Sequence, residues 1–136
     1  MKLSTKSEYA FLALLECAAA YSDGRRVKMD EIATRRSVPK KYLEHILYQL
    51  KQAGVVKTKR GASGGILLAK APDEITLAEI VRLMDGALAP TLSVSQYFYE
   101  STPLEQSPEF MHFFKEIRNY LAEKLESTTL ADLMPG

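Results

Sequence analysis

Residues 30–54 decide the fold, and they read DEIATRRSVPKKYLEHILYQLKQAG. Two acidic residues begin this stretch, and carboxylates in the first turn of a helix interact favourably with the positive end of the helix dipole. Pro39 disfavours helical geometry in the residue before it, so the first helix is expected to end near Ser37. A second helix then runs to Ala53, where Gly54 is expected to end it as a C-terminal cap. The stretch therefore predicts a short helix, a turn and a longer helix.

The spacing inside this stretch is typical of a helix-turn-helix motif. Ala33 is small where the two helices must cross closely, and the turn falls four residues later at Ser37. Leu43 and Ile46 supply apolar contacts that hold the second helix against the first. Glycine is commoner at this turn, so Ser37 is a mild departure. A three-helix core without DNA-binding function can show the same spacing, so the flanking sequence has to decide.

Before and after the motif, the sequence predicts one more helix and a β-hairpin. Thr5 is expected to cap the first helix, with Glu8 completing a capping box. The β-prone residues 55–59 and 66–68 are joined by a basic, glycine-rich turn at 60–65, which indicates a hairpin. Helix, helix, turn, helix and hairpin is the order of a winged helix-turn-helix.

Two further helices are expected in the C-terminal half. Thr76 is expected to cap the first, and Ser107, which precedes a proline, is expected to cap the second. The predicted fold class is mainly α with a small β-hairpin: a winged helix-turn-helix domain plus a long C-terminal dimerisation helix.

The charges are distributed unevenly along the 136 residues. Residues 1–70 hold 14 Lys and Arg against 6 Asp and Glu, whereas residues 71–136 hold 4 against 11. A basic half joined to an acidic half suggests an N-terminal part that meets a polyanion. Two ordinary solvated faces would give the same distribution, so charge alone leaves both interpretations open.

Several classes of protein are not expected from this sequence. No apolar run approaches the roughly 20 residues of a membrane helix, and the first residues do not resemble a signal peptide, so we expect a cytoplasmic protein. The one cysteine excludes an intrachain disulfide and a multi-cysteine metal site. We find no nucleophile–base pair or phosphate loop, so no enzyme is expected.

The second helix of the motif is amphipathic in the way that a DNA-reading helix requires. A major groove about 12 Å wide admits one helix, whose first two turns reach the base edges. Its predicted contact residues, which lie off the apolar stripe, are Lys40, Lys41, Tyr42, Glu44 and His45. For any one of them, an ordinary solvated helix face is the alternative.

The hairpin turn is a second candidate contact. Lys59 and Arg60 precede glycines, whose N–H groups can approach phosphate closely, and an arginine here suits a narrow minor groove. Ser63 and Gly64 complete the predicted contact residues of the wing. A nucleotide-phosphate loop is disfavoured, because no Gly-Lys-Ser/Thr follows and no helix begins there.

Five stretches carry a resemblance to a known family: MKLSTKSEYA at 1–10, YLEHIL at 42–47, KRGASGGILL at 59–68, ITLAEI at 75–80 and STTLADL at 127–133. In combination they resemble the Rrf family of bacterial winged-helix transcription regulators over nearly the whole chain. The resemblance implies a long C-terminal helix that crosses to a partner subunit. It also implies that Arg60 enters the minor groove and that Glu44 and His45 tune the choice of DNA sequence.

The sequence departs from this family at one place. Cluster-binding members carry three cysteines before the dimer helix, and residues 86–107 here contain none. An iron–sulfur cluster needs mainly thiolate ligands, so we expect no cluster of the family's usual kind and no other cofactor or metal. We interpret Cys17 as a buried small hydrophobe, with a redox-sensing thiol as the alternative.

The last long helix carries an apolar stripe that needs a partner. A two-fold partner would bury the stripe and duplicate the DNA-reading helix, so we expect a homodimer on a pseudo-palindromic operator. The residues expected in the dimer core are Phe110, Phe113, Phe114, Ile117, Leu121 and Leu125.

The predicted organisation is a DNA-binding domain at 1–86, a linker at 87–107, and a dimerisation helix with a C-terminal tail at 108–136. The linker is aromatic at 94–99. This is compatible with a small-molecule effector pocket, a docking surface for a protein effector, or a simple cover over the dimer helix. The predicted function is that of a transcription regulator that binds double-stranded DNA in a sequence-specific way and acts as a repressor. The alternative is a protein-interaction module that regulates through a partner protein.

Overall fold

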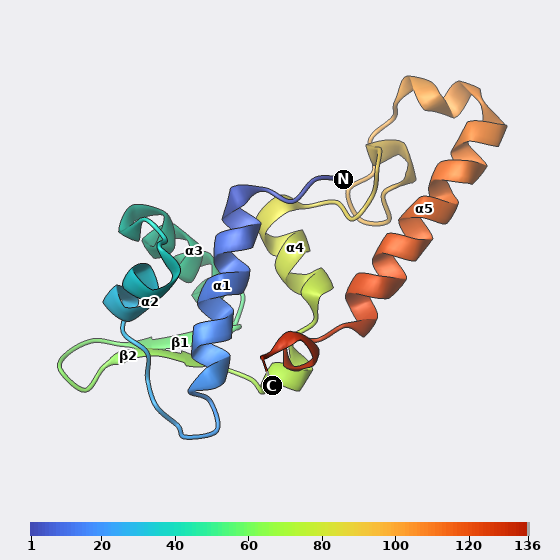
Figure 1. Ribbon diagram of the computed structural model, residues 1–136. Coiled ribbons are helices and arrows are strands. Elements are labelled where there is room, and N and C mark those ends of the chain that lie inside the picture. Colours follow the sequence, from blue (N-terminus) through green and yellow to red (C-terminus); the bar gives the residue numbers. More distant parts are fainter. Residues whose placement is uncertain (136) are drawn as a thin grey trace.

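The computed structural model describes residues 1–135. They form five α-helices and a two-stranded antiparallel hairpin, which confirms the predicted mainly helical fold class. Figure 1 shows α4 between the group of α1, α2, α3 and the hairpin on one side and the long α5 on the other. The elements are α1 (Thr5–Ala19), α2 (Met29–Arg36), α3 (Lys40–Gln52), β1 (Val56–Lys59), β2 (Gly65–Leu68), α4 (Leu77–Asp85) and α5 (Pro108–Ser127).

The turn of the helix-turn-helix motif lies where the sequence predicts it. Helix α2 ends at Arg36 and is capped by Ser37, whose φ of 53° and ψ of 42° place it in the left-handed region. Its N–H donates to the carbonyl oxygen of Ala33, as does that of Val38 at 3.2 Å. A Cβ is sterically unfavourable in this conformation, which explains why glycine is commoner at such a turn.

An apolar core holds α3 in place. Leu43, Ile46 and Leu50 on α3 are fully buried and face α1 at helical spacing. Leu14 from α1 and Ile32 from α2 belong to the same cluster. Truncation of such a buried residue to alanine costs roughly 2–5 kcal/mol, so this cluster fixes the rotation of α3 about its own axis.

The cap of α1 lies one residue before the predicted one. Ser4, not Thr5, is the N-cap: its Oγ accepts a hydrogen bond from the Ser7 N–H at 3.1 Å. Asp85, at the end of α4, accepts hydrogen bonds from the Ser4 N–H at 3.0 Å and from the Ser4 hydroxyl. The prediction of Thr5 was wrong, because the Ser4 hydroxyl caps the helix, and Ser4 is also held by Asp85, a partner 81 residues further along the chain that no local pattern shows.

The C-terminal segment returns to the winged-helix core after α5. Leu130 is buried in the same cluster as Leu14. Its N–H donates to the Ile75 carbonyl oxygen at 2.8 Å, and the Leu77 N–H donates to the Thr128 carbonyl oxygen at 2.9 Å. Figure 1 accordingly shows the segment that follows α5 beside the beginning of α4. The tail, predicted to belong with the dimerisation helix, therefore also completes the core of the N-terminal part.

Cys17 lies inside this core. Burial, with a smaller contribution from the neighbouring Glu16 carboxylate, raises the pKa of its thiol to about 12. The thiolate is the reactive form of cysteine, and almost none exists at neutral pH when the pKa is this high. The structure therefore favours the interpretation of Cys17 as a small core residue over a redox sensor. Within residues 1–135 no helix is long and apolar enough to cross a membrane.

Ser37→Gly is expected to raise the free energy of unfolding by about 0.5–1 kcal/mol, because glycine adopts the left-handed conformation without the Cβ penalty. Urea denaturation followed by circular dichroism measures the change. Thr34→Gly, at an exposed position inside α2, is the control and should lower stability by about 1 kcal/mol. Equal destabilisation by both substitutions would show that Ser37 is not strained.

Cys17 is expected to resist iodoacetamide in the folded protein at mildly alkaline pH and to react readily in guanidinium chloride. The raised pKa keeps the folded thiol protonated at mildly alkaline pH. Intact-mass spectrometry over time measures both rates. Alkylation of the folded protein at the denatured rate would contradict the burial of this side chain.

Candidate nucleic-acid interface

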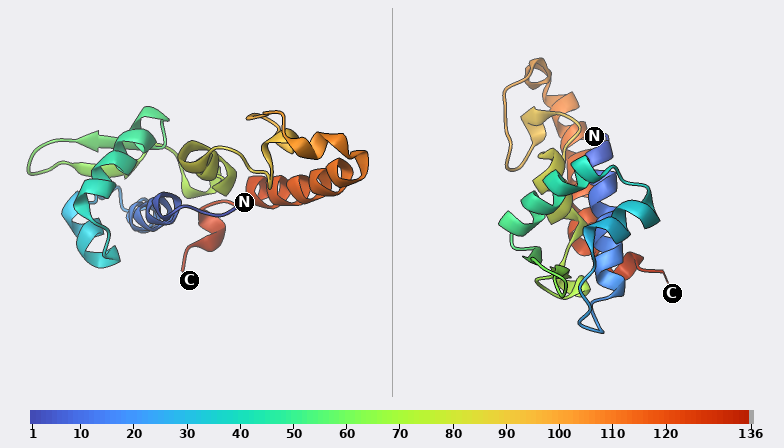
Figure 2. Two further views of the ribbon diagram at one scale, coloured as in Figure 1. Left: turned by 90° about the horizontal axis from the view of Figure 1, so that it is seen from above. Right: turned by 90° about the vertical axis from the view of Figure 1, so that its left-hand side faces the viewer.

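The polar face of α3 and the hairpin lie at one end of the molecule. Figure 2, in its left-hand view, shows α2, α3 and the hairpin at one end and α5 at the other. Because the apolar side of α3 faces the core, its opposite side faces solvent. The five residues predicted to contact DNA from this helix are all exposed: Lys40, Lys41, Tyr42, Glu44 and His45.

Tyr48 is a further exposed residue on α3 that the sequence analysis missed. Its side chain is 62% exposed, slightly more than that of Tyr42 at 59%. It follows Glu44 by four residues, so it lies one turn further along the same helix face. That spacing is the signal that could have identified it.

Lys40 differs from its neighbour Lys41, because it is already paired. Its Nζ lies 2.8 Å from Oδ1 of Asp30, at the beginning of α2. The hydrogen bond to Asp30 and the charge of that carboxylate raise the pKa of Lys40, so the ammonium group stays protonated. Lys41 has no salt bridge among residues 1–135 and offers an uncompensated charge.

Much of the positive charge of α2 is used inside the domain. Arg36 and Arg35 bind the carboxylate of Glu16 on α1, at 2.8 and 3.5 Å. Arg25 binds Glu31 at 3.3 Å. These pairs connect α2 to α1 and to the loop before it, and they remove three arginines from the charge available to a polyanion.

The hairpin turn is shaped by a glycine that admits no side chain. A Cβ on Gly64 would lie 2.1 Å from the carbonyl oxygen of Lys59. Gly64 is buried, and its N–H donates to the Gly61 carbonyl oxygen at 3.0 Å. We predicted Gly64 as a DNA contact, but its N–H is engaged within the turn, where the residue sets the shape of the wing. Lys59, Arg60 and Ser63 are exposed around it.

The hairpin is fixed to the beginning of α2. Val27 and Ile66 exchange two backbone hydrogen bonds of 2.9 and 2.8 Å. The Nζ of Lys28 donates to the carbonyl oxygens of Gly61 and Ala62 at 3.1 and 3.0 Å. These contacts set the position of the wing tip relative to the helix-turn-helix motif. The sequence analysis missed Lys28, because residues 33 positions apart share no local pattern.

Helix α5 has an apolar side that the single chain does not cover. None of its 20 residues is buried. An apolar groove of about 520 Å³ runs between α5, α4 and α1. Of the six residues predicted for the dimer core, Phe110, Phe113 and Ile117 are exposed, and Phe114, Leu121 and Leu125 are half-buried.

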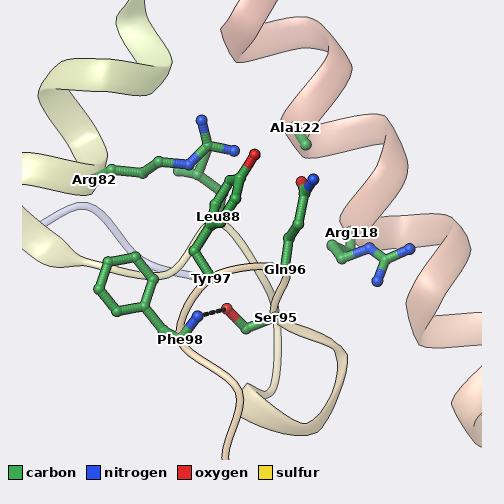
Figure 3. A pocket seen from close by; sticks show the side chains of 8 residues that line it. All are labelled: Arg82, Leu88, Ser95, Gln96, Tyr97, Phe98, Arg118 and Ala122. Carbon is green, nitrogen blue, oxygen red and sulfur yellow. Dashed lines mark hydrogen bonds between the residues drawn. The ribbon is translucent and has the colours of Figure 1, made fainter.

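The aromatic segment between α4 and α5 leaves little enclosed space. Figure 3 shows Arg82 of α4 and Arg118 of α5 on either side of it, and the guanidinium of Arg82 lies 4.9 Å from the centre of the Tyr97 ring. The space that these residues enclose is about 10 Å³, room for about one water molecule. The side chains of Tyr97 and Tyr99 remain mostly exposed. The described conformation therefore has no preformed effector cavity at this place.

The residues present do not fit an iron–sulfur cluster. Such a cluster needs mainly thiolate ligands, and the only thiol in the sequence, that of Cys17, is enclosed in the core. Among residues 1–135, no group of three or more His, Cys, Asp or Glu side chains is placed to hold a metal ion.

Comparison with known protein families matches residues 3–136 to the Rrf2 family, described as iron-dependent transcriptional regulators. An Rrf2-like HTH-type transcriptional regulator of Rhodobacter capsulatus is 37% identical over 97% of this chain and 91% of its own length. The HTH-type transcriptional regulator CymR of Bacillus subtilis is 33% identical over 98% of this chain and 89% of its own length.

Solved structures agree with these relatives. The structure of B. subtilis CymR, described as the global cysteine regulator of that organism, has a TM-score of 0.83 at 32% identity and covers 98% of this chain and 95% of its own. The structure of T. potens IscR has a TM-score of 0.74 at 28% identity, covering 98% and 85%. The chain therefore belongs to the Rrf2 family and is a DNA-binding, HTH-type transcription regulator.

Proposed function

We propose that this regulator binds a pseudo-palindromic operator as a homodimer and acts as a repressor by occupying promoter DNA. One observation carries the proposal: the polar face of α3 and the wing lie at one end of the chain, and α5 remains uncovered at the other. A two-fold axis beside α5 would place two reading ends on one duplex. The half-sites would then be spaced by whole helical turns of about 10 base pairs.

Helix α3 is the element that we assign to the major groove. There, Glu44 would accept a hydrogen bond from a cytosine amino group, and His45 would donate one to a base acceptor. Lys41 would contact a guanine edge or a phosphate, and Tyr42 a thymine methyl group or a phosphate. Tyr48 extends the same face towards the next turn of DNA backbone.

The wing is assigned to the adjacent minor groove. Arg60 would enter the groove, where a narrow width enhances the negative potential. Lys59 and Ser63 are exposed beside it, and we assign them to backbone phosphates, which position a protein without reading sequence. Lys40 joins this set with its charge partly balanced by Asp30.

Three functional regions follow: DNA binding at 1–86, a docking or effector segment at 87–107, and the dimerisation helix with its tail at 108–136. The chain lacks the thiolate ligands that an iron–sulfur cluster needs, which supports regulation without such a cluster. The exposed Tyr97 and Tyr99 favour a protein effector over a small molecule, because they line almost no enclosed space. A module that regulates only through a partner protein would use the same segment. We expect the protein in the cytoplasm, because its target is chromosomal DNA.

Arg60→Ala is expected to raise the Kd for an operator duplex about tenfold, because a good groove contact contributes roughly 1–3 kcal/mol. The duplex is first obtained by sequencing the genomic fragments that the purified protein retains. Fluorescence anisotropy at several salt concentrations then gives Kd, and wild-type affinity should fall steeply with salt as counterions are released. Lys115→Ala, an exposed lysine on α5, is the control. Weak, salt-insensitive binding that Arg60→Ala leaves unchanged would refute the proposed interface.

Ile117→Glu is expected to convert the dimer to a monomer, because the substitution places a charge in the apolar side of α5 that the partner would bury. Light scattering after size exclusion should give twice the chain mass of 15.2 kDa for the wild-type protein and the single mass for the variant. Lys115→Glu, which changes charge elsewhere on the same helix, should remain dimeric. A monomeric wild-type protein at micromolar concentration would rule out the proposed homodimer.

A further inference from the structure

A groove of about 680 Å³ lies between the end of α3 and strand β1, beside the hairpin. Four of its lining side chains are cations, and none is a carboxylate or an aromatic ring. We call it the basic groove, and its cations are Arg26, Lys51, Lys57 and Lys59.

The four cations of the basic groove have no acidic partner. None of them forms a salt bridge among residues 1–135, in contrast to Arg25, Arg35, Arg36, Lys40 and Lys70. Like charges held close together repel one another, and a bound anion relieves that repulsion. The basic groove is therefore one place where positive charge of the N-terminal half remains uncompensated.

Arg26 is the least exposed of these four cations. Its Nη1 is buried and has no hydrogen-bond partner among the described residues. Because this nitrogen is enclosed by the protein, phosphate contacts of Arg26 would come from the part of its side chain that lines the basic groove. A guanidinium group matches the geometry of two phosphate oxygens better than any other side chain. The neighbouring Val27, paired with Ile66, fixes the backbone that carries Arg26.

We propose that the basic groove binds backbone phosphates of the DNA that flanks the operator. This inference rests on the proposed function, because the basic groove continues from the wing through Lys59, which lines both. A duplex whose minor groove receives the wing would continue past the hairpin, where the basic groove opens. The lining lacks an aromatic surface on which a base could stack, so the binding depends on phosphate charge and not on sequence.

The test compares two duplexes: the operator core alone, and the same core extended on each side by about one helical turn of arbitrary sequence, some 10 base pairs. Wild-type protein should bind the longer duplex more tightly and with a steeper dependence of log K on log salt. In the double variant Arg26→Gln/Lys57→Gln the advantage of the longer duplex should disappear. The salt slope on that duplex should become shallower by about 0.9 for each phosphate that the variant no longer neutralises.

Two further variants make the result interpretable. Lys57→Gln alone changes an exposed side chain and should remove part of the flank effect even if the Arg26 substitution disturbs folding. Lys115→Gln, on α5, should retain the full advantage of the longer duplex over the operator core. A wild-type protein that gains nothing from the flanks, or a Lys57→Gln variant with an unchanged slope on the longer duplex, would overturn the inference while leaving binding to the core intact. Failure to bind either duplex would instead refute the proposed function itself.

A free anion is the competing occupant of the basic groove. Isothermal titration of the DNA-free protein with inorganic pyrophosphate tests it, with Arg26→Gln/Lys57→Gln as the reference. Tight binding that is abolished in the double variant, together with no effect of the DNA flanks, would show a small-anion site and contradict the assignment to DNA. If pyrophosphate does not bind and the longer duplex binds more tightly than the core, the assignment of the basic groove to DNA phosphates is supported.

Discussion

The packing of α3 against α1 is the interaction on which the rest of the structure depends, because α3 has to serve two surfaces at once. Leu43, Ile46 and Leu50 fill the core, and their spacing leaves the opposite face of the same helix, which we propose to contact DNA, open to solvent. A rotation of about 100° per residue separates neighbouring positions on a helix. A slip of one residue would therefore turn polar side chains into the core and expose apolar ones, and the free energy of burying the three apolar side chains prevents it.

The structure divides the basic half of the chain into two sets of cations. Arg35 and Arg36 are bound to Glu16, and these pairs hold α2 against α1. The second set, on α3, the wing and the basic groove, has few acidic partners. Charge that is used to hold helices together contributes little to attraction of a polyanion, so the net charge of the half overstates its affinity for DNA. The unpaired cations, concentrated around the hairpin, determine where DNA would bind.

Helix α5 is attached to the rest of the chain at several places, including the 2.6 Å ion pair between Glu126 and Arg82 of α4, and in a dimer this attachment would give the helix a mechanical role. Arg118 near its middle donates to the Val94 carbonyl oxygen at 3.0 Å, and the segment after the helix places Leu130 in the winged-helix core. In a homodimer joined through α5, the distance between two reading ends would thus be set by packing and not by a flexible linker. A protein effector that displaced the segment around Val94 would change that distance without any iron–sulfur cluster.

The sequence by itself determined the elements, most of their caps and the division of α3 into two faces, because each depends on residues a few positions apart. It also identified the wing and the apolar stripe of α5 by local composition. Only the tertiary structure decided the contact of Ser4 with Asp85, the attachment of Lys28 to the wing tip, and the grouping of Arg26 with Lys57 in one groove. It also showed Gly64 to be buried, where the sequence had suggested a contact. The contacts of Ser4, Lys28 and Arg26 join residues distant in the chain, and their partners become neighbours only when the helices pack.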